Sequence, residues 1–155
     1  MTNNDILRRL RYALDISNPV MIKIFKLSGH DIDQSGLTAL FKKEDEEGYV
    51  ECSDKVMELF LDGLIVHRRG RKESVPGQAK KSGSPLTNNA ILKKLRIALE
   101  LKEDDMIGIL KLAGVTMSGH ELTALFRKEG HRNYKECGDQ FLRNFLNGLT
   151  VRDRG

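Results

Sequence analysis

The chain has 155 residues, of which 39% are hydrophobic and 31% charged, and it contains no tryptophan. It has no apolar run long enough to cross a bilayer and no apolar segment behind the first residues, so we expect neither a membrane protein nor a secreted one. These properties predict a cytoplasmic protein. The net charge of +4 is uneven, because acidic residues slightly outnumber basic ones in residues 1–70, whereas 71–86 and 87–155 have a basic excess.

The most informative feature of the sequence is an internal duplication. Residues 3–70 and 88–155 align without a gap at an offset of about 85 residues and match at roughly half of their positions. A repeat of roughly 70 residues is near the lower size at which a domain buries an adequate core, so we expect the two repeats to pack on each other. The predicted organisation is a first helical repeat in residues 1–70, a flexible linker in 71–86 and a second helical repeat in 87–155.

Hydrophobic residues recur with the period of an α-helix in four segments of each repeat. The fourth segment has an apolar stripe too wide for a surface helix, so we expect this helix at the centre of the repeat. The sequence therefore predicts an all-α fold, a tandem duplication of a four-helix unit that packs with pseudo-two-fold symmetry. Suitable N-cap residues for the segments of the first repeat are Asn3 or Asn4, Asn18, Asp33 and Ser53, and Ser118 is the counterpart of Asp33.

Glycines at equivalent positions of the two repeats predict two backbone constraints. Gly29 and Gly114 follow the last apolar residue of the second helix, where the residue at C′ needs a positive φ. Gly63 and Gly148 lie inside the fourth helix, where glycine costs on the order of 1 kcal/mol relative to alanine. We expect another backbone to approach closely at these two positions.

The two cysteines, Cys52 and Cys137, occupy equivalent positions before the fourth helix. We expect them to be buried as part of a hydrophobic staple, and reduced rather than joined in a disulfide. A neighbouring carboxylate raises the pKa of a thiol, which argues against a nucleophilic role. The four histidines have no histidine counterpart in the other repeat, and zinc-ligand spacing is absent. We therefore expect no metal, no cofactor and no enzymatic activity.

Several basic and acidic residues occur at equivalent positions of both repeats, which indicates a shared structural or functional role. Arg8 and Arg9, matched by Lys93 and Lys94, lie opposite the apolar face of the first helix and are expected to form a solvated surface. Caps and ion pairs explain most of the other shared polar residues, and the alternative is a ligand groove in each repeat.

Arg11 and Arg96 differ from these residues because they border the apolar face of the first helix. We expect each of them to form a partly buried structural ion pair with an acid that both repeats contain. The acids in question are Glu44 and Asp54, with Glu129 and Asp139 as their counterparts.

The second and third helices resemble a helix-turn-helix, because the turn between them is short and contains Gly29 or Gly114. A third helix in the major groove would present polar side chains to base edges, but Asp31 and Asp33 would then face phosphate. The candidate base-reading residues are Gln34, Ser35, Thr38 and Lys42 in the first repeat, with His120, Thr123 and Arg127 in the second.

Three motifs stand out when the repeats are compared. They are Asn-Asn-x-Ile-Leu-x-x-Leu-Arg at 3–11 and 88–96, Lys-Glu-Asp-Glu-Glu-Gly at 43–48, and Glu-Cys-Gly-Asp-Gln-Phe-Leu-Arg at 136–143. With these motifs the chain resembles the YehS-like family of two-copy bacterial proteins, a domain of unknown function. The resemblance implies a cytoplasmic bacterial protein, and it brings no established activity or site residue.

We expect a non-catalytic binding or regulatory protein. The first hypothesis is association with nucleic acid through the basic second repeat and linker, and the alternative is a helical protein–protein interaction module. The sequence leaves the oligomeric state open. The candidate binding residues are Arg11, Lys43, Tyr49, Arg96, Arg127, Lys128 and Tyr134.

Overall fold

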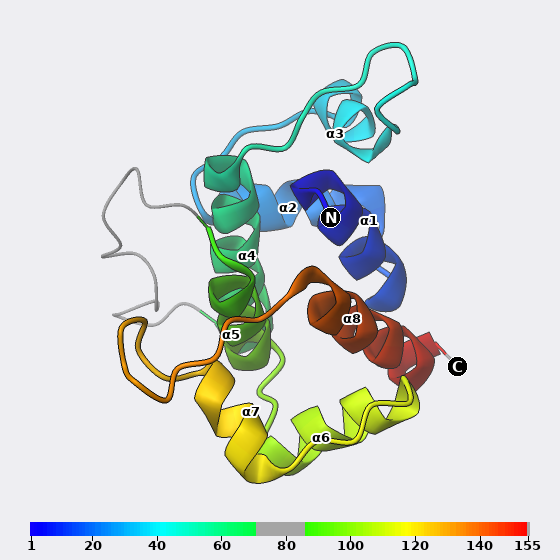
Figure 1. Ribbon diagram of the computed structural model, residues 1–155. Helices are drawn as coiled ribbons and strands as arrows, with labels where there is room; N and C mark the ends of the chain where they lie inside the picture. The colour runs from blue at the N-terminus through cyan, green and yellow to red at the C-terminus, as the bar shows by residue number, and fades with distance from the viewer. Residues whose placement is uncertain (71–85, 155) are drawn as a thin grey trace.

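The computed structural model describes residues 1–70 and 86–154, which form eight helices and no strand (Figure 1). The predicted all-α fold with a duplicated four-helix unit is confirmed. All of the predicted linker except Leu86 lies outside the described residues. Among the described helices, none is both long and apolar enough to cross a membrane. The helices are α1 (Asn3–Ala13), α2 (Asn18–Leu27), α3 (Gln34–Phe41), α4 (Asp54–Arg69), α5 (Asn88–Ala98), α6 (Glu103–Leu112), α7 (Gly119–Leu125) and α8 (Asp139–Arg154).

The two repeats are interleaved rather than merely adjacent. The first helix of each repeat packs mainly against the last helix of the other, so that α1 lies along α8 and α5 lies along α4. The second helix of each repeat covers the last helix of its own, with α2 on α4 and α6 on α8. The short helices α3 and α7 lie at opposite ends of the molecule (Figure 1). The two repeats therefore share one core.

The pseudo-two-fold relation extends to individual contacts between the repeats. Arg69 Nε lies 3.4 Å from Glu100 Oε1, and at the equivalent place Arg154 Nη1 lies 2.9 Å from Asp15 Oδ1. Each pair joins the last turn of a fourth helix to the turn after the first helix of the other repeat. The predicted pseudo-two-fold packing is therefore confirmed both by the helices and by the side chains that join them.

Most of the predicted helix ends agree with the structure. Asp33, Ser53 and Ser118 accept hydrogen bonds from backbone N–H groups of the first helical turn, as their cap positions predict. Gly29 and Gly114 have φ angles of +88° and +82° after the second helix of each repeat, which confirms the predicted need for positive φ.

The predicted cap of the first helix is wrong by one residue. Thr2 and its counterpart Thr87 accept the N–H groups of the first turn at 3.1 Å in both repeats, so Asn3 and Asn4 lie inside the helix. In the same way Ser17, not the predicted Asn18, is the residue before α2. Threonine, serine and asparagine are all good caps, and neighbouring candidates differ little in free energy. The asparagine side chains thereby become available for tertiary hydrogen bonds.

The prediction of buried, unpaired cysteines is confirmed. Cys52 and Cys137 are each 2% exposed, and both are free thiols. Burial, helped by the neighbouring Asp54 or Asp139 carboxylate, raises the pKa of each thiol to about 12. Thiols with such a pKa stay protonated at neutral pH, which leaves them poor nucleophiles.

The expectation of a solvated basic face is wrong at Lys94. Lys94 is only 6% exposed, its ammonium contacts the Asp62 carboxylate, and Glu58 Oε2 lies 3.9 Å away. Both acids belong to α4, so this is a buried ion pair between the repeats. The interleaving explains the difference, because it turns this side of α5 toward α4. Lys93, one residue earlier, is exposed as expected.

Candidate functional site

A buried asparagine in the first helix of each repeat holds the loop before the fourth helix. Asn4 Nδ2 donates to the carbonyls of Leu40 and Val50, both at 2.9 Å, and its Oδ1 accepts the N–H of Cys52 at 2.8 Å. The hydroxyl of Tyr49 donates to the same oxygen at 3.2 Å. Because every one of these partners belongs to the fold, Tyr49 and Asn4 have a structural role here.

The second repeat reproduces this arrangement. Asn89 Nδ2 donates to the carbonyls of Leu125 and Lys135 at 2.9 Å, and its Oδ1 accepts the N–H of Cys137 at 2.8 Å. Asn88 Nδ2 in turn donates to Asp139 Oδ1 at 2.8 Å, as Asn3 does to Asp54 in the first repeat at 2.9 Å. The shared asparagines and aspartates are therefore explained by structure rather than by a ligand groove.

The predicted ion pairs of Arg11 and Arg96 are wrong. The guanidinium of Arg11 lies 5.0 Å from the centroid of the Phe41 ring and donates to Asn18 Oδ1 at 2.7 Å. The guanidinium of Arg96 lies 4.7 Å from the centroid of the Phe126 ring. Among the described residues, neither arginine forms an ion pair with a carboxylate. The face of an aromatic ring attracts a cation, so it takes the place that we expected an acid to have.

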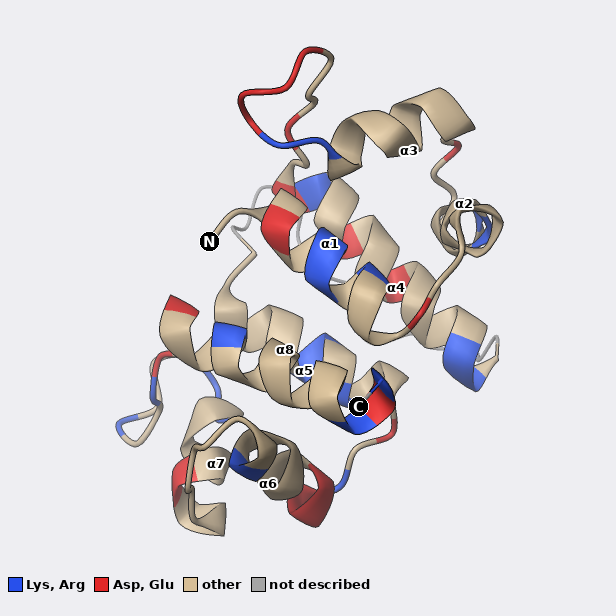
Figure 2. Cartoon of the chain, turned by 90° about the vertical axis from the view of Figure 1, so that its right-hand side faces the viewer, with Lys and Arg blue, Asp and Glu red and all other residues tan. Residues whose placement is uncertain are grey.

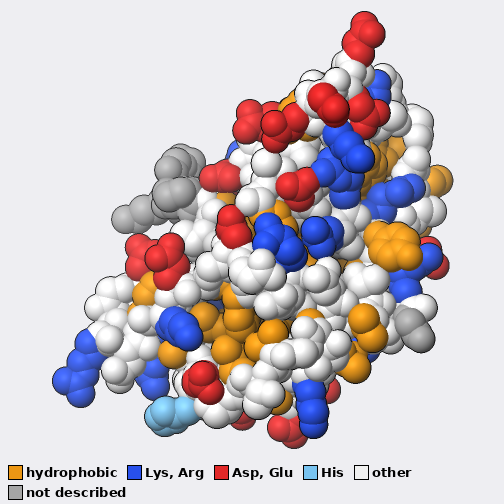
Figure 3. Space-filling view, turned by 45° about the vertical axis from the view of Figure 1, so that its right-hand side comes forward, with side chains coloured by type: hydrophobic (Ala, Val, Ile, Leu, Met, Phe, Trp, Pro, Cys, Tyr) orange, Lys and Arg blue, Asp and Glu red, His pale blue; other side chains and the backbone are white. Residues whose placement is uncertain are grey.

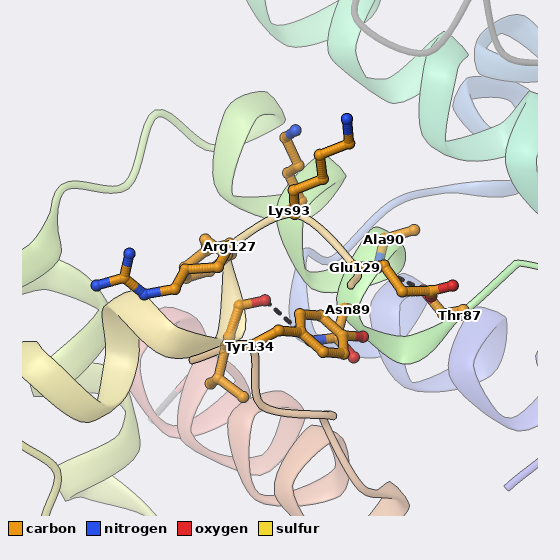
Figure 4. A pocket seen from close by; sticks show the side chains of 10 residues that line it. Thr87, Asn89, Ala90, Lys93, Arg127, Glu129 and Tyr134 are labelled. Carbon is orange, nitrogen blue, oxygen red and sulfur yellow. Dashed lines mark hydrogen bonds between the residues drawn. The ribbon is translucent and has the colours of Figure 1, made fainter. Parts of the chain in front are cut away.

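Arg127, Lys128 and Tyr134 lie together in the second repeat, where they line a cavity of about 370 Å³ with Lys93 (Figure 4). The cavity, called the basic pocket below, is formed by the first turns of α5, the end of α7 and the loop that follows α7. Arg11 and Arg96 are not among its lining residues. The rest of its lining is Thr87, Asn89, Ala90, Leu125, Phe126 and Glu129.

The basic pocket is suited to an anion. In Figure 4 the Lys93 side chain extends outward at the rim, and the Arg127 guanidinium extends away from Tyr134. The Nε of Arg127 is buried without a hydrogen-bond partner in the described part of the chain. Burial, with the nearby Glu129 and Glu136, raises the pKa of Tyr134 from its ordinary value of 10.0, which is already far above neutral pH, and the protonated hydroxyl can act as a donor. Glu129 opposes an anion, but the cationic side chains outnumber it.

In the first repeat, the basic side chains at the positions equivalent to the basic pocket bind acceptor groups of the protein itself. Arg8, the counterpart of Lys93, contacts the Asp5 carboxylate and donates to the carbonyl of Lys42 at 3.0 Å. The ammonium of Lys42, the counterpart of Arg127, donates to the carbonyl of Glu47 at 2.7 Å. The loop after α3 is acidic, whereas the loop after α7 carries basic residues (Figure 2). Lys43 is exposed beside this acidic loop, so the structure does not join it to a basic pocket.

Most helix-turn-helix candidates lie on the exposed sides of α3 and α7, namely Gln34, Ser35 and Thr38 on α3 and His120 and Thr123 on α7. Lys42 and Arg127 follow these helices and are half-buried. The hydroxyls of Thr38 and Thr123 donate to carbonyls of their own helices at 2.9 and 2.8 Å. Base reading by these helices stays a prediction. Within residues 1–70 and 86–154, no three His, Cys, Asp or Glu side chains form a group that could hold a metal ion.

The sequence analysis missed a groove between α1 and α8. This cavity of about 490 Å³ is lined by residues from both repeats. The residues are individually unremarkable, and only the packing of α1 on α8 brings them together. They are Arg8, Arg9, Tyr12, Asn147, Thr150 and Val151.

Comparisons with known proteins agree with the duplication. The model of a family described as "Protein of unknown function (DUF1456)" matches residues 3–70 and again residues 88–155. The chain is 44% identical over 152 residues to "Uncharacterized protein YehS" of Escherichia coli (strain K12), which covers 98% of this chain and 96% of that protein. No solved structure matches the chain. The family resemblance seen in the motifs is thus confirmed, and the chain belongs to the DUF1456 family of proteins of unknown function.

Proposed function

We propose that this protein is a non-catalytic nucleic-acid-binding protein whose second repeat holds backbone phosphate in the basic pocket. The observation that carries the proposal is the grouping of Lys93, Arg127 and Lys128 around one cavity. Among the described residues, none of these side chains forms an ion pair within the protein. In the first repeat the counterpart of Lys93 is neutralised by Asp5, and the residue at the Asp5 position of the second repeat is Ala90.

Phosphate chemistry fits the groups that the pocket offers. Each phosphodiester carries one negative charge and several acceptor oxygens, so the ammonium groups of Lys93 and Lys128 can hold one phosphate while the Arg127 guanidinium, which extends away from Tyr134, meets a neighbouring one. Binding of a phosphate polymer to lysine and arginine releases condensed counterions, so the affinity depends steeply on salt. The proposal includes a cytoplasmic location, which the two free cysteines support.

The test is a salt titration of binding to mixed-sequence single-stranded and duplex DNA and RNA. We expect a steep negative slope of log affinity against log salt in the unmodified protein. Arg127→Ala/Lys128→Ala should weaken binding at low salt and make the slope shallower by about 1 for each lost phosphate contact. The matched control is Lys42→Ala/Lys43→Ala, which removes the equivalent charges of the first repeat and should change binding little.

Two outcomes would contradict the proposal. Equal effects of the two double variants would show that the basic pocket has no special role. Binding that is absent at low salt would remove nucleic acid as the ligand and leave the helical protein–protein interaction module as the better function. Thermal melts of both variants show whether a loss of binding reflects a loss of fold.

A further inference from the structure

The two interfaces between the repeats are equivalent by the pseudo-two-fold, yet they differ in charge. We call the α4–α5 interface the closed seam and the α1–α8 interface the open seam. In the closed seam the buried Lys94 contacts Asp62, with Glu58 nearby, so a cation is matched by acids. In addition, Ile65 and Val66 of α4 are buried. In the described part of the closed seam, the one buried cation therefore faces acids, and Val66 is withdrawn from solvent.

In the open seam the same positions hold a different set of charges. Arg9 takes the place of Lys94, while Asn147 and Arg143 take the places of the two acids. Arg9 Nη1 donates to Asn147 Oδ1 at 3.0 Å, and Arg143 Nη1 donates to Gln140 Oε1 at 2.7 Å. Within the described residues, neither arginine forms an ion pair. Because amide oxygens carry no net charge, these hydrogen bonds do not neutralise Arg9 or Arg143; Asp139 is the acid whose charge acts on Arg143.

The open seam also exposes a valine that is buried in the closed seam, and beside it an aromatic ring. Val151, the counterpart of Val66, is 47% exposed, whereas Val66 is 7% exposed. Tyr12 lines the groove and is 58% exposed. On the face that carries α1 and α8, exposed hydrophobic side chains lie beside Lys and Arg side chains, and Asp and Glu side chains are densest at the upper tip, with others scattered lower down (Figure 3). The groove therefore offers an aromatic ring in a basic surrounding.

The ring of Tyr12 is held in place. The guanidinium of Arg154 lies 4.2 Å from its centroid, and the same arginine is anchored by Asp15 at 2.9 Å. A cation over one face fixes the ring by a cation–π contact, and the large exposed fraction of the side chain leaves the rest of the ring accessible. Tyr12 is thus a fixed flat surface rather than a freely moving side chain.

We infer that the open seam binds an unpaired base of a single-stranded nucleic acid, stacked on Tyr12, with Arg9 and Arg143 contacting the flanking phosphates. Aromatic rings between basic side chains are the usual means by which proteins hold single strands, because every base has a π-face. A paired base is stacked on its neighbours and does not offer that face. The inference rests on the proposed function for the class of ligand, but it concerns a different surface and predicts a preference for single strands.

The test compares binding of a short oligo-dT strand and of a duplex of the same length by fluorescence anisotropy. Tyr12→Ala should weaken single-strand binding at least about fivefold, as the loss of one stacked base predicts, and should change duplex binding less than about twofold. Tyr12→Phe keeps the ring and should retain the affinity. Leu112→Ala removes an exposed hydrophobic side chain outside the groove and serves as the control.

A reporter in the groove makes the stacking directly visible. The chain contains no tryptophan, so Tyr12→Trp introduces a single indole into the groove. Its fluorescence should be quenched by oligo-dT and unaffected by duplex. Arg9→Ala/Arg143→Ala should make the salt dependence of single-strand binding shallower by about 1 for each lost contact.

The outcomes separate this inference from the proposed function. If Arg127→Ala/Lys128→Ala abolishes binding while Tyr12→Ala leaves single-strand affinity unchanged, the basic pocket is supported and the stacking site is overturned. If single-strand binding depends on Tyr12 but not on Arg127 and Lys128, the stacking site is supported and the basic pocket fails. Quenching of the Tyr12→Trp indole by an acidic peptide, but not by oligo-dT, would identify a protein ligand and overturn the inference.

Discussion

Gly63 in α4 lies so close to the backbone of Ile24 in α2 that a Cβ at position 63 would stand 2.0 Å from the Ile24 carbonyl oxygen. Gly148 in α8 has the same relationship with Ile109 in α6, also at 2.0 Å. The predicted close approach of a second backbone is therefore confirmed in both repeats. A carbonyl oxygen belongs to the helix backbone and cannot rotate away as a side chain does, so only glycine fits.

The first prediction concerns this contact. Gly63→Ala and Gly148→Ala should each lower the free energy of unfolding by about 1–3 kcal/mol or more, because the two helices must move apart. Gly108→Ala is the matched control, since Gly108 also lies in a helix but has nothing within 4 Å of its Cβ position. That change should stabilise the protein by about 0.5–1 kcal/mol. Urea denaturation measures all three, and losses of equal size would contradict the prediction.

The duplication explains why much of the fold could be predicted from the sequence. Helix periodicity and the paired glycines are local signals, and each appears twice. The partner of each helix is not a local signal, so nothing in the sequence showed that α5 packs on α4. For this reason Lys94 was expected in solvent, and the open seam was not foreseen.

The candidate site was predicted in part for a similar reason. Arg127, Lys128 and Tyr134 follow one another closely in the chain, so their proximity could be expected, whereas Lys93 joins them only through the packing of α5 beside the loop after α7. Arg11 was correctly placed at the edge of the apolar face. Its partner was not, because the face of an aromatic ring attracts a guanidinium and here lies where we expected a carboxylate.

The second prediction concerns the buried asparagines. Asn4→Ala should destabilise the protein by about 1–3 kcal/mol for each of the buried backbone groups of Leu40 and Cys52 that is left without a partner. Asn89→Ala should have a similar effect in the second repeat. The control is Asn133→Ala, at an exposed position in the loop after α7, which should change stability by less than about 0.5 kcal/mol. Thermal unfolding followed by circular dichroism is the measurement, and a loss at Asn4 no larger than the control would refute the assigned role.

The third prediction concerns the cysteines. Native Cys52 and Cys137 should react with iodoacetamide far more slowly than the unfolded chain, because both are buried and protonated. Burial raises the pKa of each thiol from 9.0 to about 12, so the unfolded chain loses these protons first as the pH rises. The free energy of unfolding should therefore be unaffected by these thiols below pH 9.0 and fall as the pH approaches about 12.

The variant Cys52→Ala/Cys137→Ala isolates this effect. It should show a smaller loss of stability between neutral pH and pH 11 than the unmodified protein, because the remaining tyrosines and lysines titrate in both. Mass spectrometry of partly alkylated native protein identifies the reacting thiol. Rapid labelling at one cysteine would contradict the burial argument for that repeat.

The last prediction uses the two seams as each other's control. Lys94→Ala removes a buried ammonium from the Asp62 carboxylate, and breaking a buried pair in this way costs about 3–5 kcal/mol. Arg9→Ala removes the equivalent residue of the open seam, which is partly exposed and bonded to the neutral Asn147, so its loss should cost about 1 kcal/mol or less.

Urea denaturation at low and high salt measures both variants. We expect the Lys94 loss to depend only weakly on salt, because water and ions do not reach the pair. Equal losses of unfolding free energy for the two variants would show that Arg9 is as buried and as tightly paired as Lys94. Arg9 would then not be available to bind a ligand in the open seam.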